Sequence, residues 1–295
     1  MKKFIPFIFV LLWSTGFIGT KYGLMYSSSG DFLTLRTIAN LVVFAVLAFA
    51  IRKSELSGRQ IVHAMITGLL IHGAYLGGVY SAIESGLPAG LAAIIVGVQP
   101  LLTALIAVLL LNERLSLLQW AALFLGLFGL ILVVSSSMQL QSVPYHAVLL
   151  AVIALLGITI GTIYQKRFCQ NQALLPSVFW QYFSCLFVFI GISYWQYPST
   201  IEWNIEFIFS LAWLVLALSV AAILLLLYMI KQGDAAKVST YFYLVPPLTA
   251  IEAWFLFDES LSLVMLLGIL LCAISVFLVI NKTNNTENLE VEIAK

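Results

Sequence analysis

The stretch PLLTALIAVLLLNERLS at residues 100–116 recurs as PPLTAIEAWFLFDESLS at residues 246–262. In both copies a proline is followed 13 residues later by a glutamate, and a Leu-Ser pair closes the motif. The copies are 146 residues apart, which is about half of the 295-residue chain. A repeat at that interval predicts that the chain consists of two similar halves.

Both copies lie in apolar runs, and such runs dominate the chain. Hydrophobic residues make up 62% and charged residues 9%, against roughly 45–50% and about 25% in a typical soluble domain. The count of 3 cysteines disfavours a disulfide scaffold. A net charge of +1 argues against a nucleic-acid binder, which would need a basic face. The composition therefore predicts an all-α polytopic membrane protein, whose partners are the lipid bilayer and a small molecule.

A membrane-crossing helix needs about 20 mainly apolar residues. Trp13 and Phe17 stand where a signal peptide would carry small cleavage-site residues, so the first apolar segment is expected to remain as a span. Ten segments satisfy the length requirement, namely 4–26, 32–51, 61–83, 87–111, 115–134, 147–165, 177–197, 207–230, 238–257 and 261–280. We expect one five-helix repeat over residues 1–136, a second over 145–281, and a polar, disordered cytoplasmic tail over 282–295.

The basic residues predict the orientation of the spans. With a cytoplasmic N-terminus, twelve Lys and Arg residues fall on the cytoplasmic side and only Lys21 falls on the other side. Short loops rich in Lys and Arg stay in the cytoplasm. We therefore expect a multi-pass protein of the plasma (inner) membrane with both termini in the cytoplasm.

Five spans per half is an odd number, so the two halves must enter the bilayer from opposite sides as inverted repeats. Glu113 is then expected at the cytoplasmic face and Glu259 at the exterior. Inverted repeats are typical of carriers that open a central site to each side in turn. Duplication without alternating access would leave the same pattern.

These residues resemble the EamA-type ten-helix branch of the drug/metabolite transporter superfamily, over nearly the whole chain. The features that carry the resemblance are the two Pro-to-Glu spacings with their Leu-Ser pairs, Leu12-Trp13-Ser14-Thr15, Arg36 and Trp180-Gln181-Tyr182. The resemblance implies a secondary carrier of small organic solutes, often an exporter of amino acids, metabolites or drugs. It does not define the solute.

Three ionisable side chains fall well inside the predicted spans: Arg36, His72 and Glu252. Such groups cost about 2.5–3.5 kcal/mol each on insertion scales, so they face protein or a water-filled cavity. Glu252 is the candidate proton-coupling carboxylate, and a static ion pair with Arg36 at similar depth is the alternative. His72 falls near the mid-plane, where substrate contact or proton relay competes with a hydrogen bond to another helix.

Helix breaks are predicted at equivalent places in the two halves, at Pro100 after Gln99, and at Pro246 with Pro247. A proline removes one backbone donor and frees a carbonyl that a neighbouring helix or a cavity must satisfy. Paired breaks favour a transport site, with a packing kink as the alternative. The substrate-binding candidates are polar and aromatic residues within the spans: Trp13, Arg36, His72, Tyr75, Gln99, Trp180, Gln181 and Tyr243. For Trp180 and Tyr182, a role as membrane-interface anchors is the alternative.

The sequence contains no P-loop, no HExxH motif and no cluster of metal-ligand residues, so neither ATP, a metal nor another cofactor is expected. It also lacks the Ser/His/Asp or paired-carboxylate spacing of an intramembrane enzyme. A non-transporting sensor or assembly factor is the second alternative to a carrier. Because one chain holds both halves, a monomer suffices, and a dimer is left open.

Overall fold

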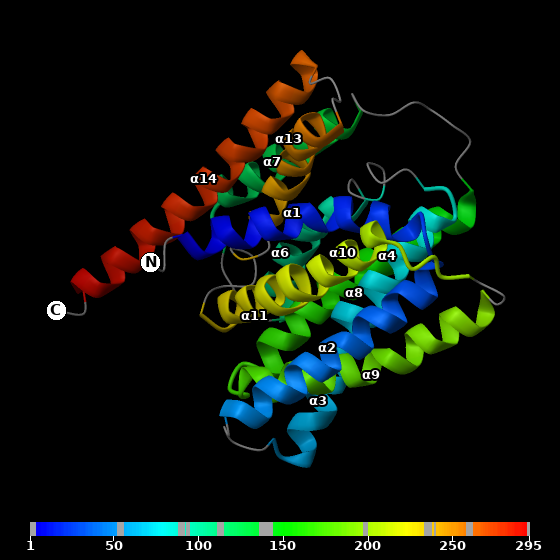
Figure 1. Cartoon of the computed structure of the whole chain (residues 1–295). Coiled ribbons are helices and arrows are strands. Elements are labelled where there is room, and N and C mark those ends of the chain that lie inside the picture. The colour runs from blue at the N-terminus through cyan, green and yellow to red at the C-terminus, as the bar shows by residue number, and fades with distance from the viewer. Residues whose placement is uncertain are drawn as a thin grey trace.

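The computed structural model of this chain is a bundle of helices (Figure 1). It describes residues 4–51, 56–87, 92, 95–110, 115–135, 144–196, 200–232, 238, 240–257 and 262–293. In these ranges all regular elements are helical. Six helices there are long and apolar enough to cross a membrane: Ile5–Leu24, Ser29–Leu47, Gly58–Glu84, Tyr145–Phe168, Leu174–Trp195 and Ile205–Gln232.

The first half of the chain contains one long helix whose middle turns are π-helical. The helices of this half are α1 (Ile5–Leu24), α2 (Ser29–Ile51), α3 (Gly58–Gly68), η2 (Leu69–Ala74), α4 (Tyr75–Glu84), α6 (Gln99–Leu110) and α7 (Leu117–Ser135). The long helix consists of α3, the π-helical η2 and α4. It begins at a capping box, in which Ser57 and Gln60 satisfy each other's backbone N–H groups.

The second half also contains a long helix with a π-helical middle. The helices of this half are α8 (Tyr145–Phe168), α9 (Leu174–Trp195), α10 (Ile205–Trp213), η3 (Leu214–Ala222), α11 (Ile223–Gln232), η4 (Tyr241–Leu244), α13 (Val245–Phe257) and α14 (Leu263–Ile293). The long helix is α10, the π-helical η3 and α11. The two π-helical segments begin at Leu69 and Leu214, which are 145 residues apart.

Helices of the two halves pack against each other. In Figure 1, α2 lies along α9 on one side of the bundle, and α7 lies along α14 on the other. The N-terminus of α2 meets the C-terminal end of α9, where the Gly30 N–H donates to Gln196 Oε1 at 2.9 Å. The start of α9 lies near the start of α3, where Gln172 Nε2 donates to the Gln60 carbonyl at 3.1 Å. The helices α2 and α9 are therefore antiparallel.

The two long π-containing helices also run in opposite directions. Helix α4 ends at Glu84, which accepts a hydrogen bond from Ser29 at the start of α2. At the same end of the bundle the Glu202 N–H, just before α10, donates to the Tyr26 carbonyl at 2.9 Å. Helix α11 ends at the opposite end, where Lys166 Nζ donates to the Ile230 carbonyl.

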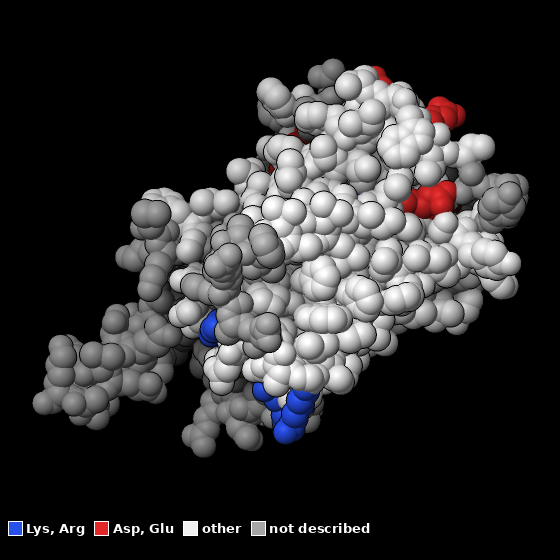
Figure 2. Space-filling view, turned by 60° about the horizontal axis from the view of Figure 1, so that its bottom comes forward, with Lys and Arg blue, Asp and Glu red and all other residues white. Residues whose placement is uncertain are grey.

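On the face of the bundle shown in Figure 2, the surface charges of the described residues lie toward its two ends. Figure 2 shows Lys and Arg at one end, Asp and Glu at the other, and an uncharged belt between them. The basic end carries Arg59, Lys166, Arg167 and Lys231, and the acidic end carries Asp31, Glu84, Glu202 and Glu206. The other basic residues expected on the cytoplasmic side have no described side chains, and Glu113 and Glu259 lie outside the described residues.

Close helix packing around the first π-helical segment depends on glycine in α8. A Cβ atom on Gly157 would lie 2.8 Å from the Ala74 Cβ and 2.9 Å from the Leu70 carbonyl oxygen. On Gly161 it would lie 2.6 Å from Ile71 Cγ1. Small residues let backbones approach in this way in membrane helices. These contacts fix the position of η2.

The structure departs from the expected spans in two ways. Within the expected span 87–111, a turn at Val98 separates the helical residues 95–97 from α6, which begins at Gln99; α13 begins at Val245, directly after the 3-10 turn η4. In the stretch expected to form the polar tail, helix α14 continues as far as Ile293. After Gly268 the chain has no glycine or proline, the residues that most often end a helix.

Candidate functional site

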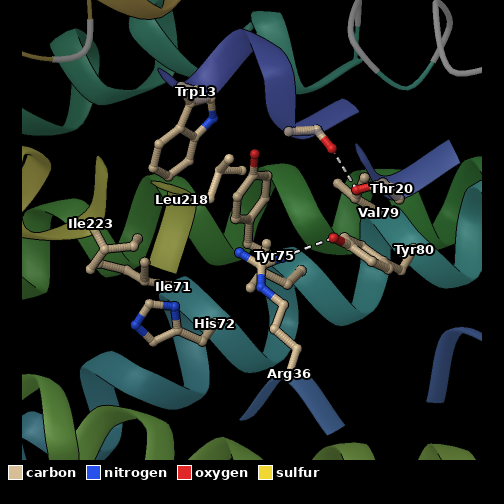
Figure 3. A pocket seen from close by; sticks show the side chains of 12 residues that line it. Trp13, Thr20, Arg36, Ile71, His72, Tyr75, Val79, Tyr80, Leu218 and Ile223 are labelled. Atoms are coloured by element: carbon tan, nitrogen blue, oxygen red, sulfur yellow. Dashed lines mark hydrogen bonds between the residues drawn. The ribbon is translucent and has the colours of Figure 1, made fainter. Parts of the chain in front are cut away.

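A cavity opens between α1, α2 and the two long π-containing helices (Figure 3). It holds about 490 Å³ of space that no atom occupies, including its mouth. Helix α1 contributes Trp13, Gly16 and Thr20, whose spacing of three and four residues places them on one face of the helix.

Arg36 is the charged group of this cavity. Its side chain is only 3% exposed. Its Nε donates to Ser219 Oγ at 2.9 Å, and one terminal nitrogen donates to the Tyr80 hydroxyl at 2.8 Å. Both acceptors are neutral, and neither bond involves a carboxylate of the described residues. A buried cation without a counter-ion costs several kcal/mol of desolvation, which neutral hydrogen bonds offset only in part.

Aromatic rings form much of the remaining wall. Trp13 stacks on Tyr75 with 6.3 Å between ring centroids and 13° between planes. Figure 3 shows Trp13 at the top of the cavity, with His72 and Arg36 at the bottom. These rings and the flanking aliphatic side chains offer an apolar surface next to a positive charge.

His72 is fully buried and lies against α9. Its ring stacks on Tyr182 with 4.3 Å between centroids, and the Tyr182 hydroxyl donates to the Ser219 carbonyl at 3.3 Å. Gln181 lies beside the imidazole, but neither ring nitrogen makes a well-formed hydrogen bond. Tyr182 is 1% exposed, so the alternative of a membrane-interface anchor is wrong for this residue.

Both π-helical segments reach the cavity. His72 belongs to η2, and Leu218, next to the Arg36 acceptor Ser219, belongs to η3. A π-helical turn leaves the regular i→i−4 hydrogen-bond pattern and often occurs at functional sites. The π-helical segments η2 and η3 therefore both reach the cavity that contains the charged side chain of Arg36.

Glu252 lies outside the cavity wall, on α13 where this helix crosses α1. Its Oε1 accepts a hydrogen bond from Ser14 Oγ at 2.5 Å, and its buried Oε2 has no hydrogen-bond partner. Thr249 Oγ1 donates to the Ser14 carbonyl at 3.2 Å, one turn along the same helix. Because Arg36 and Glu252 bind different partners, the static ion pair between them is not formed.

The structure brings together four of the sequence-predicted substrate contacts, Trp13, Arg36, His72 and Tyr75. The other four do not line the cavity. Gln181 is buried behind His72, where its Nε2 donates to Ser177 and Gln165. Trp180 is half-buried against two phenylalanine rings of its own helix.

Gln99 and Tyr243 are buried elsewhere in the bundle. The Tyr243 hydroxyl donates to the Leu123 carbonyl of α7 at 2.9 Å. Both amide atoms of Gln99 are buried without a hydrogen-bond partner. Pro100 is the second residue of α6, and Pro246 and Pro247 are the second and third of α13. The prolines therefore stand at helix starts in both halves.

Sequence reasoning missed Tyr80 and Ser219, the two residues that hold Arg36. Tyr80 follows His72 by eight residues, a spacing that recurs on one side of an amphipathic helix, so periodicity contained a usable signal. Ser219 lies 183 residues from Arg36 and in an otherwise apolar run. Only the packing of η3 against α2 shows its role.

Several membrane-length helices around a small, open cavity are the features of a multi-pass membrane protein, and the family of the chain makes it one of the transporter class. The chain belongs to the EamA-like transporter family, which matches residues 4–135 and 146–281. This membership confirms the resemblance drawn from the sequence, and the family is one of transporters and not of enzymes.

Curated relatives are similar over most of the chain. An uncharacterized transporter of Bacillus subtilis (strain 168) is 26% identical over 93% of this chain and 90% of the relative. A probable amino-acid metabolite efflux pump of Escherichia coli (strain K12) is 24% identical over 90% of each. An S-adenosylmethionine uptake transporter of Rickettsia prowazekii (strain Madrid E) is 24% identical over 54% of this chain and 52% of the relative.

A solved crystal structure shares the fold. It superposes with a TM-score of 0.78 over 96% of this chain and 97% of that chain, at 17% sequence identity. The helical arrangement described above is therefore one that an experimentally determined protein adopts.

Proposed function

We propose that this protein is a secondary carrier that exports amino acids, related metabolites or drugs across the inner membrane by alternating access. The observation that carries the proposal is the cavity between the two long π-containing helices, with Arg36 buried in its wall. A site made jointly by both halves of the chain opens to one side or the other when the halves move relative to each other.

We further propose that ten membrane helices form two inverted five-helix repeats, over residues 1–136 and 145–281. Four features support this arrangement. Helices α2 and α9 are antiparallel, the two long helices run in opposite directions, and their π-helical segments are 145 residues apart. Helices α6 and α13 begin 146 residues apart, at Gln99 and Val245. Because one chain supplies both halves, a monomer is sufficient.

The division of charge in Figure 2 supports an orientation with the basic end in the cytoplasm. Helix α1 runs toward the acidic end, since Tyr26, two residues after it, contacts Glu202 there. The N-terminus then lies on the cytoplasmic side. After an even number of spans the C-terminus lies there as well.

The names of the relatives support a small-solute substrate but differ in direction. One relative is named as an efflux pump and another as an uptake transporter. Direction therefore has to be measured, and reconstituted vesicles allow this. Purified protein in proteoliposomes, loaded with an amino-acid mixture, should exchange internal for labelled external amino acids. Vesicles without protein give the background.

Two results separate the carrier from the alternatives. Exchange that falls strongly in Trp13→Ala and Tyr75→Ala variants, while Trp203→Ala retains it, supports transport through this cavity; Trp203 is 61% exposed at the surface. Binding of amino acids without any movement across the vesicle membrane would instead favour the sensor. If neither binding nor exchange occurs with any solute of the mixture, the proposed function is wrong.

For energy coupling we propose Glu252 as the proton-carrying group. Its Oε2 is buried without a partner, and its Oε1 is bound to Ser14 in the middle of α1, so gain or loss of a proton alters the contact between α13 and α1. Glu252→Gln keeps the shape of the side chain and cannot ionise. This variant should retain exchange but lose accumulation driven by a pH gradient. Undiminished accumulation in the variant would dismiss the coupling role.

A further inference from the structure

We propose that Arg36 binds the carboxylate of the transported solute, so that the cavity selects solutes with a free carboxylate and an apolar or aromatic body. This inference rests on the proposed function and adds the chemical class of the substrate to it. The site offers a buried, oriented guanidinium next to stacked aromatic rings.

The geometry of Arg36 prepares it for a second partner. A guanidinium has five N–H donors in one plane. The structure uses Nε for Ser219 and one N–H of a terminal nitrogen for Tyr80. These acceptors come from η3 and α4, two helices of different halves, so the plane is held from two directions. The three other N–H donors suit the paired oxygens of a carboxylate, which Arg binds in bidentate fashion.

The electrostatics leave a place for an anion. Among the described residues, the hydrogen bonds from Arg36 to Ser219 and Tyr80 involve no carboxylate: Glu84 accepts from Ser29 and Gln196, Asp31 accepts from Ser193, and Glu252 accepts from Ser14. A buried cation is destabilising until an opposite charge joins it. A solute carboxylate would supply that charge, whereas an amide or an amine would not.

The other wall of the cavity fits the remainder of such a solute. Trp13 and Tyr75 present stacked rings, and Ile71 and Leu218 add aliphatic surface. An amino acid or a simple carboxylic acid with an apolar side chain can place its carboxylate on Arg36 and its side chain on these rings. A strongly hydrophilic side chain would lose hydration there without hydrogen-bond partners.

Matched pairs of solutes test the proposal, whichever amino acid or carboxylic acid the natural substrate is. For phenylalanine, leucine and methionine, the free acid and its primary amide have the same side chain and nearly the same size. 3-Phenylpropanoate and 2-phenylethylamine isolate the carboxylate and the ammonium group. Each compound is tested as a competitor of labelled amino-acid exchange in proteoliposomes. We expect each acid to compete at least about tenfold better than its amide, and 3-phenylpropanoate to compete better than 2-phenylethylamine.

Variants of Arg36 connect the preference to this side chain. Arg36→Gln should abolish the preference for the acid, so that acid and amide compete equally. Arg36→Lys keeps the positive charge but loses the paired N–H donors of the guanidinium, so it should retain part of the preference. Arg59→Gln removes an exposed arginine at the basic end and should leave the preference unchanged. Size-exclusion profiles show which variants are folded. If Arg36→Gln is not folded, the acid-to-amide ratios of wild type and Arg36→Lys still decide the question.

The results distinguish the carboxylate site at Arg36 from the proposed carrier function. Equal competition by acids and amides in the wild type, or an unchanged preference in folded Arg36→Gln, overturns the carboxylate site while the carrier stands. Absence of exchange with all of these compounds overturns the proposed function itself.

Discussion

Replacing Tyr80 by Phe removes a single hydroxyl from the cavity wall, and this hydroxyl accepts the 2.8 Å hydrogen bond from Arg36. The aromatic ring remains, with its stacking on Phe32 at 6.0 Å between centroids. Tyr80 is 2% exposed, so the loss occurs in a buried environment. A hydrogen bond to a charged group contributes about 1.5–3 kcal/mol, and the unpaired donor adds a desolvation cost. We therefore expect the free energy of unfolding to fall by about 1.5–3 kcal/mol.

Unfolding by sodium dodecyl sulfate in mixed micelles, followed by circular dichroism, measures this difference. Tyr194→Phe is the matched control, because that residue is 84% exposed and the same atom is removed at the surface. Ser219→Ala removes the second acceptor of Arg36, at 2.9 Å, and should have an effect of the same order. Equal stability of Tyr80→Phe and Tyr194→Phe would show that the hydrogen bond from Arg36 to Tyr80 does not stabilise the fold.

Further predictions concern packing, binding and thiol reactivity. Gly157→Ala should lower the free energy of unfolding by about 1–3 kcal/mol, because its Cβ would lie 2.9 Å from the Leu70 carbonyl oxygen; an unchanged SDS midpoint would contradict this. Trp13→Ala should weaken solute binding roughly tenfold in a thermal-shift titration, whereas equal affinity would remove Trp13 from the site. Burial raises the pKa of the Cys169 thiol, just beyond the end of α8, and hydrogen bonds with Thr67 and Gln172 oppose this in part. At pH 8 its thiolate fraction is therefore below that of a free cysteine, and iodoacetamide should modify it more slowly than in the SDS-unfolded protein; equal rates would contradict the burial.

The sequence predicted which polar residues lie inside the spans. It predicted less well which of these residues contact each other. The cost of a charge in lipid was sufficient to single out Arg36 and His72, and both line the cavity. Depth along a span, however, does not define the face of the helix. Arg36 and Glu252 were expected at one depth, yet Arg36 faces η3 and α4 while Glu252 faces Ser14 on α1.

The orientation of a helix about its own axis is determined by its packing against neighbouring helices. A single sequence contains little information about that orientation. Tyr243 has a hydroxyl at membrane depth, as the cavity residues do, but the contact of η4 with α7 turns it toward the Leu123 carbonyl. The π-helical segments had no signal in composition, since η2 and η3 have the composition of ordinary apolar helix. Their positions follow from close contacts such as that of Gly157 with η2.

Alternating access requires that one cavity open to the two sides of the membrane in turn. Leu76 lines this cavity, and Leu76→Cys, in a variant whose 3 native cysteines are replaced by alanine, places a single thiol there. A membrane-impermeant maleimide is applied to right-side-out and to inside-out vesicles. We expect labelling in both preparations and protection by a transported amino acid in each. Labelling from one side only, under all solute conditions, would contradict alternating access.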